Sequence, residues 1–490
     1  MFYEKKFSVD KPTRKRYRLS SFKGYDPESG SGTLPRDYCD EVYNFGFENN
    51  TLTGGIGLKR FTYRNAAGED ESVRVISSDC VNPDIFFGKL SDENGPFECI
   101  MATSDEYLLY VRLGKSSQWL GRIKTGRRFT SAISYLYGDD NLMLLGGGGE
   151  GIYVVSETED TYVADALTIT DLCTHYERVY AVVEGVRTSV WFSDAFDPYN
   201  WNVSLDEGGY ISLDGSLGEV LRVLSFQDYV YIFCEYGIYR LTAYSDQLQF
   251  SIKRLHCDCG RIYKDTITSC GAFVAFVTSD GVYALDGYDV TRLTDKLDDL
   301  LEGSKDHKAV FCDGKYYLSF DVADEERAGK EELVGLAEKG ADVLAVVDTE
   351  KGTAEIYRGL NIRSMCVMSG TRQHCVLAVT SASNIVMELV ENGCSSDMLP
   401  TLKYWAVKDV DFNEHMNKKY IVGVDYCTKK PFTLGVVADK KVREFRADPD
   451  KKYMPIGVSG TCFDFYIKST EQEPEIKPFG VTVDFLRRGL

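Results

Sequence analysis

The stretch Val220–Leu241, VLRVLSFQDYVYIFCEYGIYRL, decides the fold class of this 490-residue chain. An apolar run over Leu221–Leu224 is followed by a polar break at Gln227–Asp228, a second apolar run over Tyr229–Phe233, and a glycine turn into Ile238–Leu241. β-Branched and aromatic side chains dominate these runs because they suit a pleated, half-buried surface. The stretch therefore predicts two or three short strands.

The same order of strands and turns recurs along the chain. Asp265–Asp286, DTITSCGAFVAFVTSDGVYALD, repeats the apolar strand, the polar break, the second apolar run and the glycine turn. Similar units begin near residues 96, 129, 169, 220, 265, 308 and 361, a period of roughly 40–50 residues. Three or four short strands in each such period are typical of propeller blades. The units share a strand pattern without the fixed residues of kelch or WD40 repeats, and an irregular array of β-sandwiches is the alternative.

The repeats predict an all-β chain with a β-propeller of about seven blades, or six if the first unit is not a true blade. The expected segments are an N-terminal arm at 1–43, a hairpin with loops at 44–95, the propeller at 96–393 and a C-terminal antiparallel β-domain at 394–490. Propellers close by pairing strands from both ends of the chain. We therefore expect Gly57–Arg64 to pair with the last blade or with the C-terminal domain.

Two segments depart from the strand pattern. The first 40 residues read as an irregular, locally basic arm with five cations close together: Lys11, Arg14, Lys15, Arg16 and Arg18. Such an arm on an acidic protein is suited to docking on the acidic surface of a partner, and a solvated tail is the alternative. The second segment, Asp324–Gly340, is the one convincing helical stretch and is expected to be a surface helix or an insertion.

Net charge, apolar runs and cysteine content exclude some classes of protein. The formal net charge is −19, which repels nucleic acid at long range and argues against sequence-specific DNA binding. No run of apolar residues approaches membrane-spanning length, and no signal peptide is visible. The 14 cysteines are therefore expected to be reduced thiols in a chain made in a cytosol.

Catalytic motifs are missing from the sequence. Neither a phosphate-binding GxxxxGK[ST] loop nor an HExxH, EF-hand or GxSxG pattern occurs. The glycines at 146–151, GGGGEG, precede a strand and not a helix, which predicts a tight hairpin turn. Trp191 and Trp201 flank a proline turn, and they anchor the loop to its own blade or form a sugar-stacking platform.

The best candidate metal ligands are His256, Cys257 and Cys259 in HCDCGR. Zinc needs three or four ligands of suitable geometry, and no second ligand pair follows this motif, so strand packing explains it equally simply. We therefore expect no catalytic residue, no metal site and no cofactor.

Three stretches carry a resemblance to a known family. They are FKGYDPESGSG with YCDEVYNFGFENNTLTGGIGL near the N-terminus, TSVWFSDAFDPYNWN with GGYISLDGSLGEVLRVLSFQDYVYIFCEYGIYRL in the centre, and KDVDFNEHMNKKYIVGVDY near the C-terminus. In order and pattern they resemble the tail-hub and nozzle proteins of tailed bacteriophages, including the packaged-DNA stabilisation proteins.

The resemblance implies a structural, non-enzymatic virion protein. Its copies would form a homo-oligomeric ring below the portal and adaptor, extend the DNA conduit, let DNA pass without sequence preference and retain the packaged genome. The protein would be assembled in the host cytoplasm and reside in the virion tail. Two other functions remain open: a carbohydrate-binding or carbohydrate-cleaving propeller, and a cytosolic scaffold propeller.

Overall fold

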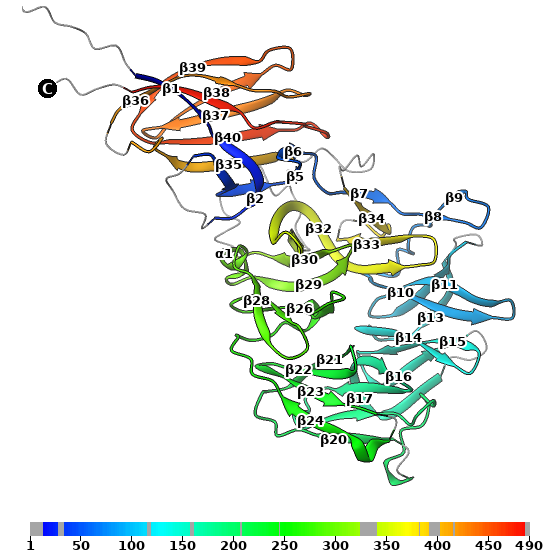
Figure 1. Cartoon of the computed structure of the whole chain (residues 1–490). Coiled ribbons are helices and arrows are strands. Elements are labelled where there is room, and N and C mark those ends of the chain that lie inside the picture. The colour runs from blue at the N-terminus through cyan, green and yellow to red at the C-terminus, as the bar shows by residue number, and fades with distance from the viewer. Residues whose placement is uncertain are drawn as a thin grey trace, which may run out of the picture.

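The computed structural model describes residues 13–27, 34–114, 119–156, 161–205, 208–244, 246–323, 341–381, 383–391, 402–414 and 417–485. Within these ranges the regular secondary structure is almost entirely β-strand, which confirms the expected all-β class. The strands build a ring of sheets and a β-sandwich at one end of it (Figure 1). The few helical turns of these ranges are α1 (Asp298–Leu301), η1 (Val203–Leu205), η2 (Gln247–Gln249) and η3 (Lys264–Thr266).

The ring is a propeller of seven four-stranded antiparallel blades, counted over the described ranges. Blades 1 to 3 contain β10 (Asp84–Asp92), β11 (Gly95–Thr103), β12 (Tyr107–Arg112), β13 (Trp119–Lys124), β14 (Ser131–Tyr137), β15 (Asp140–Gly146), β16 (Glu150–Val155), β17 (Thr161–His175), β18 (Arg178–Val183), β19 (Ser189–Phe192) and β20 (Gly209–Ser212). The long strand β17 is the outer strand of blade 2 and, further along, the inner strand of blade 3.

Blades 4 to 7 follow the same order from the inner to the outer strand. They contain β21 (Val220–Phe226), β22 (Tyr229–Cys234), β23 (Gly237–Thr242), β24 (Ser251–Arg254), β25 (Thr268–Ser269), β26 (Val274–Thr278), β27 (Gly281–Leu285), β28 (Val290–Thr294), β29 (Lys305–Cys312), β30 (Lys315–Asp321), β31 (Ala341–Asp348), β32 (Thr353–Ser369), β33 (His374–Thr380) and β34 (Met387–Val390). The long strand β32 is shared between blades 6 and 7. The stretch Val220–Leu241 forms β21 to β23, as its pattern predicts.

A strand from the N-terminal part of the chain completes the last blade. Strand β7 (Gly57–Arg60) pairs antiparallel with β34, from Gly57 opposite Val390 to Arg60 opposite Met387. This pairing confirms the expected closure for Gly57–Arg60 and assigns it to the last blade, whereas Thr62–Arg64 (β8) pairs with Asp70–Ser72 (β9). Leu58 of β7 is completely buried among apolar residues of blades 6 and 7, so the closing strand contributes to their core.

The C-terminal domain is a sandwich of two antiparallel sheets. One sheet has the order β1 (Thr13–Arg18), β41 (Gly480–Phe485), β36 (Lys419–Asp425) and β39 (Tyr453–Gly460). The other has the order β38 (Lys441–Ala447), β37 (Phe432–Ala438), β40 (Phe463–Ser469), β35 (Lys403–Val410) and β4 (Glu41–Tyr43). A single apolar core containing the fully buried Trp405 runs between the sheets and continues into blades 5 and 6.

The N-terminal segment corrects the expectation of an irregular arm. Its described part forms β1, which adds to the sandwich by pairing with β41, and β2 (Ser20–Tyr25), which pairs with β3 (Arg36–Cys39) and touches β32. Leu19 and Phe22 are buried, and the Phe22 ring meets the Trp405 ring edge to face at 5.0 Å. These apolar anchors hold the segment in the core despite its basic outer side chains.

Some segments lie elsewhere than expected. Strand β10 begins at Asp84, within the segment that the sequence assigned to a hairpin and loops, so blade 1 starts before residue 96. The same segment also contains β5 (Gly46–Glu48), β6 (Thr51–Thr53), β8 (Thr62–Arg64) and β9 (Asp70–Ser72). The expected helix at 324–340 lies outside the described residues. Among the helices of the described ranges, none has the length and apolar character needed to cross a membrane.

Candidate functional site

The propeller encloses a pocket on its axis to which every blade contributes. The pocket has a volume of about 320 Å³ and is lined mainly by the inner strands of the blades. Its polar lining residues are Asp84, Thr130, Ser131, Asp171, Arg222, Asp265, Thr268, Lys308 and Ser364. A propeller that binds or cleaves a small molecule usually does so in such a concave, polar-centred site, so the state of these acids bears on function.

Asp84 is held in a network of cations in the wall of the pocket. Its carboxylate accepts from Lys308 Nζ at 2.7 Å and from Arg128 Nη1 at 2.8 Å. Burial alone would raise the pKa of Asp84, but the two cations outweigh it and the pKa is lowered. A general acid for glycoside cleavage needs a raised pKa, which this environment does not provide for Asp84.

Asp171 is likewise engaged by its surroundings. Its buried carboxylate accepts from the backbone N–H of Val223 at 3.0 Å and lies 4.0 Å from Arg222 Nε. The Lys264 ammonium donates to the carbonyl of the neighbouring residue Thr170 at 2.7 Å. These contacts join blades 3, 4 and 5. Asp171 therefore stabilises the packing of the blades around the axis, as Asp84 does through Lys308 and Arg128.

The basic residues named from the sequence lie on β1, at the outer edge of its sheet. Arg14 makes a bidentate pair with Asp484, at 2.7 and 2.8 Å, and Arg16 pairs with Asp425 at 2.9 Å. Lys15 lies over the Phe485 ring, with Nζ 5.1 Å from the centroid. Arg18 is also exposed, whereas Lys11 lies outside the described residues. The structure thus displays the described cations on one exposed edge strand.

A second exposed surface follows the turns of blades 2 to 5. In an antiparallel blade, the turns between strands one and two and between strands three and four lie at the same edge. We call this surface the acidic–aromatic rim, and its exposed members are Tyr137, Asp139, Asp140, Tyr176, Phe196, Asp228, Tyr244, Asp246, Leu248, Asp286, Tyr288 and Asp289. Leu248 is 91% exposed, an unusual position for a large apolar side chain.

Specific contacts hold neighbouring parts of the rim together. The Tyr137 and Tyr199 rings meet edge to face at 5.3 Å, and the Phe196 N–H donates to the Glu177 carbonyl at 2.8 Å. Blade 4 joins blade 5 through Tyr231, whose hydroxyl donates to the Gly287 carbonyl at 2.9 Å. These contacts connect the rim of blade 2 with that of blade 3, and the rim of blade 4 with that of blade 5.

The HCDCGR motif does not form a three-ligand site among the described residues. Cys257 Sγ and Cys259 Sγ lie 2.8 Å apart, and both half-buried side chains pack on the core of blades 4 and 5, whereas His256 is exposed. The two tryptophans anchor their loop, because Trp201 Nε1 donates to the Pro198 carbonyl at 2.9 Å and Trp191 packs on Tyr210. The glycine run at 146–151 spans the expected turn between β15 and β16.

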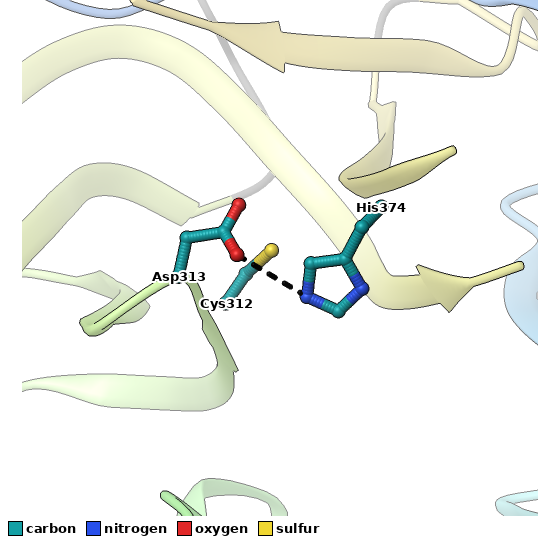
Figure 2. A group of neighbouring side chains, drawn as sticks. All are labelled: Cys312, Asp313 and His374. Carbon is teal, nitrogen blue, oxygen red and sulfur yellow. Dashed lines mark ion pairs between the residues drawn. The ribbon is translucent and has the colours of Figure 1, made fainter. Parts of the chain in front are cut away.

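One group of potential metal ligands escaped the sequence analysis. In the part of the chain that the structure describes, a single three-residue group brings its ligand atoms within 4.8 Å of one another: Cys312, Asp313 and His374 (Figure 2). His374 comes from the next blade and is distant in sequence, so no short motif could reveal the group. Burial raises the pKa of the Cys312 thiol to about 12, which disfavours a thiolate nucleophile of the Cys–His type.

Comparison with known proteins leaves the family unassigned. No family model matches the chain, and no curated protein matches it. Among solved structures, the chain is similar to BBS1N, solved in complex with ARL6DN and soaked with lead, at 11% identity and a TM-score of 0.42, covering 68% of this chain and 95% of that one. It is also similar to BamB from Moraxella catarrhalis at 10% identity and a TM-score of 0.36, covering 64% and 97%.

Proposed function

We propose that this chain is a non-enzymatic structural subunit of a bacteriophage tail. Copies of it join into a ring that extends the DNA conduit below the portal and adaptor and helps to retain the packaged genome. The three stretches that resemble tail-hub and nozzle proteins support this proposal, and so does the joining of a propeller to a β-sandwich through one core. The formal net charge of −19 also suits a conduit, because an acidic protein lets DNA slide without binding.

The observation that carries the proposal is the complementarity of two exposed surfaces. Strand β1 displays four exposed cations on the edge of a sheet, in a protein of formal net charge −19. Arg14 and Arg16 pair with Asp484 and Asp425 of the same chain, and Lys15 and Arg18 lie beside them. The acidic–aromatic rim displays six aspartates among exposed aromatic side chains. In Figure 1 the strand β1 lies at the upper end of the molecule, whereas β20 to β24 lie at the lower end.

Two different surfaces that attract each other produce a head-to-tail contact between copies. Such a heterologous contact closes into a ring when the rotation between copies allows it. Tyrosines suit the contact, since they bury a large apolar ring and still offer a hydroxyl at low entropic cost. Among the described strands, none pairs with the outer side of β1, and a segment of a neighbouring copy can add there.

The pocket argues against the carbohydrate-cleaving alternative. A glycosidase needs one carboxyl group that stays protonated near neutral pH and a second one that is ionised. The pKa of Asp84 is lowered, and Asp171 is engaged by a backbone N–H and by Arg222. Two of the three acids that line the pocket, Asp84 and Asp171, are thus held in structural contacts.

The test is the mass of the full-length protein by light scattering at several concentrations, together with electron micrographs. We expect rings whose population falls when salt rises from about 0.05 to about 0.5 M, because charge attraction is screened. The variant Lys15→Glu/Arg18→Glu should lower the oligomer mass. The matched control Lys441→Glu/Arg446→Glu makes the same charge change on the exposed strand β38 and should retain the oligomer mass. A monomer at all concentrations, or equal effects of both variants, would contradict the contact.

A further inference from the structure

The group of Cys312, Asp313 and His374 lies at the seam between blades 6 and 7. Cys312 is the last residue of β29, and Asp313 begins the tight turn that leads into β30. His374 is the first residue of β33, in the neighbouring blade. Figure 2 shows the carboxylate and the imidazole facing each other, with the Cys312 sulfur beside the space between them. The three donors therefore converge from two blades.

The distance between the imidazole and the carboxylate fits one edge of a tetrahedral metal site. His374 Nε2 lies 3.5 Å from Asp313 Oδ1, and the ligand atoms of all three residues lie within 4.8 Å of one another. With metal–nitrogen and metal–oxygen bonds of about 2.0–2.1 Å, two donors of a tetrahedral site are about 3.3 Å apart. The observed separation of the imidazole and the carboxylate thus nearly equals one edge of such a tetrahedron.

Backbone contacts fix the turn that carries Cys312 and Asp313. Asp313 and Gly314 both have positive φ, at 48° and 77°, as expected for a two-residue hairpin turn of this kind. The Gly314 carbonyl accepts from the Thr349 N–H at 3.0 Å and from the Thr349 hydroxyl at 2.8 Å. These bonds tie the turn to the end of β31. A fixed turn lowers the entropic cost of assembling the site.

The donor set and its exposure indicate the class of metal. A thiolate, an imidazole and a carboxylate together favour zinc or a similar borderline ion over calcium and magnesium, which prefer oxygen donors. Cys312 is only 4% exposed, whereas the side chains of Asp313 and His374 are 74% and 47% exposed. The sulfur therefore lies at the base of the group and the other two donors lie at its solvent edge. A water molecule can supply the fourth ligand from solvent.

We propose that Cys312, Asp313 and His374 bind one Zn²⁺ ion, with water as the fourth ligand, and that this ion staples blade 6 to blade 7. The Cys312 thiol loses its proton to solvent when its sulfur binds the metal, and neither partner changes oxidation state. Blade 7 is the blade that β7 completes, so the staple reinforces the propeller next to its closure. This inference is independent of the proposed tail function.

The test uses the full-length protein, stripped of metal and titrated with Zn²⁺ by calorimetry or with Co²⁺ by absorption. We expect one equivalent to bind, a thiolate-to-cobalt charge-transfer band, and a higher midpoint of thermal unfolding when metal is present. The variants Cys312→Ser and His374→Asn should each weaken binding by at least about 100-fold, since even residues that only support a ligand contribute 10- to 100-fold. Asp313→Asn should weaken it less, because its amide oxygen can still bind.

Matched controls separate the site from adventitious binding. The exposed residues Cys427 and His256 lie outside the group, so Cys427→Ser and His256→Asn should bind metal like the wild type. Circular dichroism and thermal midpoints of the metal-free variants establish that they are folded. The proposal would be overturned if the charge-transfer band were missing from the wild type. It would also be overturned if the Cys312 and His374 variants bound zinc as tightly as the two controls.

Discussion

Arg358 and Asp342 form an ion pair that is closed off from solvent. Arg358 Nη2 donates to Asp342 Oδ2 at 2.5 Å, and the two side chains are 0% and 3% exposed. The Arg358 backbone N–H also donates to Asn44 Oδ1 at 2.8 Å, and the Asn44 amide donates to the Leu402 carbonyl at 2.9 Å. Arg358 thus lies where the N-terminal segment connects blade 6 with the first residues of the sandwich.

Removing one member of this pair should cost more than removing both. The variant Arg358→Met leaves the Asp342 carboxylate buried without its cation, and we expect a loss of about 3–5 kcal/mol in the free energy of unfolding. The double variant Arg358→Met/Asp342→Leu removes both charges and should recover part of that loss. Urea unfolding followed by tryptophan fluorescence measures both effects. A double variant less stable than the single one would contradict the interpretation that an unpaired charge causes the loss.

The closing strand gives a second prediction. Leu58 is completely buried in the core of blades 6 and 7, whereas the adjacent Lys59 is exposed on the same strand. We expect Leu58→Ala to cost about 2–5 kcal/mol because it opens a cavity, and Lys59→Ala to cost less than about 0.5 kcal/mol. Hydrogen exchange should become faster in β34, the strand that β7 pairs with, in the Leu58 variant alone. Unchanged exchange in β34 would contradict a role of β7 in closing the ring.

Strand pattern predicted much of this fold because each blade repeats its own local signal. Val220–Leu241 alone contains three adjacent strands of one blade, and apolar alternation marked the long strands of the sandwich equally well. The closing strand was predicted from topology, since a propeller needs one. Strand β10 was not predicted, because turn residues lie both before and after it and the whole segment was interpreted as loops.

The N-terminal segment and the metal-ligand group needed the three-dimensional structure. The outward cations of β1 mask its partly buried Tyr17, whose ring lies 5.2 Å from that of Phe412. The partner of β1 is β41, at the other end of the chain, so its pairing leaves no local pattern. Cys312 and His374 meet only because neighbouring blades pack side by side. Long-range packing of this kind is not encoded in any short window of sequence.

A buried histidine should make stability depend on pH between about 6.5 and 4. His307 stacks on Tyr263 with ring centroids 4.0 Å apart, and its Nε2 hydrogen-bonds with the Ser304 hydroxyl at 2.7 Å. Burial lowers the pKa of His307 to about 4, against a small opposing effect of Asp306, whereas an unfolded histidine titrates near 6.5. The unfolded chain therefore binds the proton first. The stability that depends on neutral His307 is complete above pH 6.5 and is lost as the pH falls toward 4.

The variant His307→Gln should flatten this part of the pH profile. Between pH 6.5 and 4, the free energy of unfolding of the wild type is expected to fall by up to about 3 kcal/mol because of His307. The variant should not show this fall, whatever its stability at neutral pH. His256→Gln, at an exposed position, serves as the control and should keep the slope of the wild type. Urea unfolding at half-unit steps of pH measures the difference. Equal slopes in all three proteins would show that another group governs this window.

Asp84 should control stability in a lower pH window. Lys308 and Arg128 lower its pKa in the folded protein despite the opposing effect of burial, so an unfolded aspartate, near 3.9, binds a proton at higher pH than the folded one. The stability from this network is complete above about pH 4 and is lost as the pH falls through the lowered pKa.

We expect Asp84→Asn to cost about 3 kcal/mol at pH 7, because both cations lose a partner that is only 12% exposed. The matched control is Asp105→Asn, which removes the exposed second partner of Arg128, at 2.7 Å, and should cost less than about 1 kcal/mol. The difference in the free energy of unfolding between the two variants should narrow as the pH falls below about 4, because Asp84 of the Asp105→Asn variant then binds a proton in the unfolded chain before it does so in the folded protein. A difference that stays constant as the pH falls below 4 would contradict this assignment.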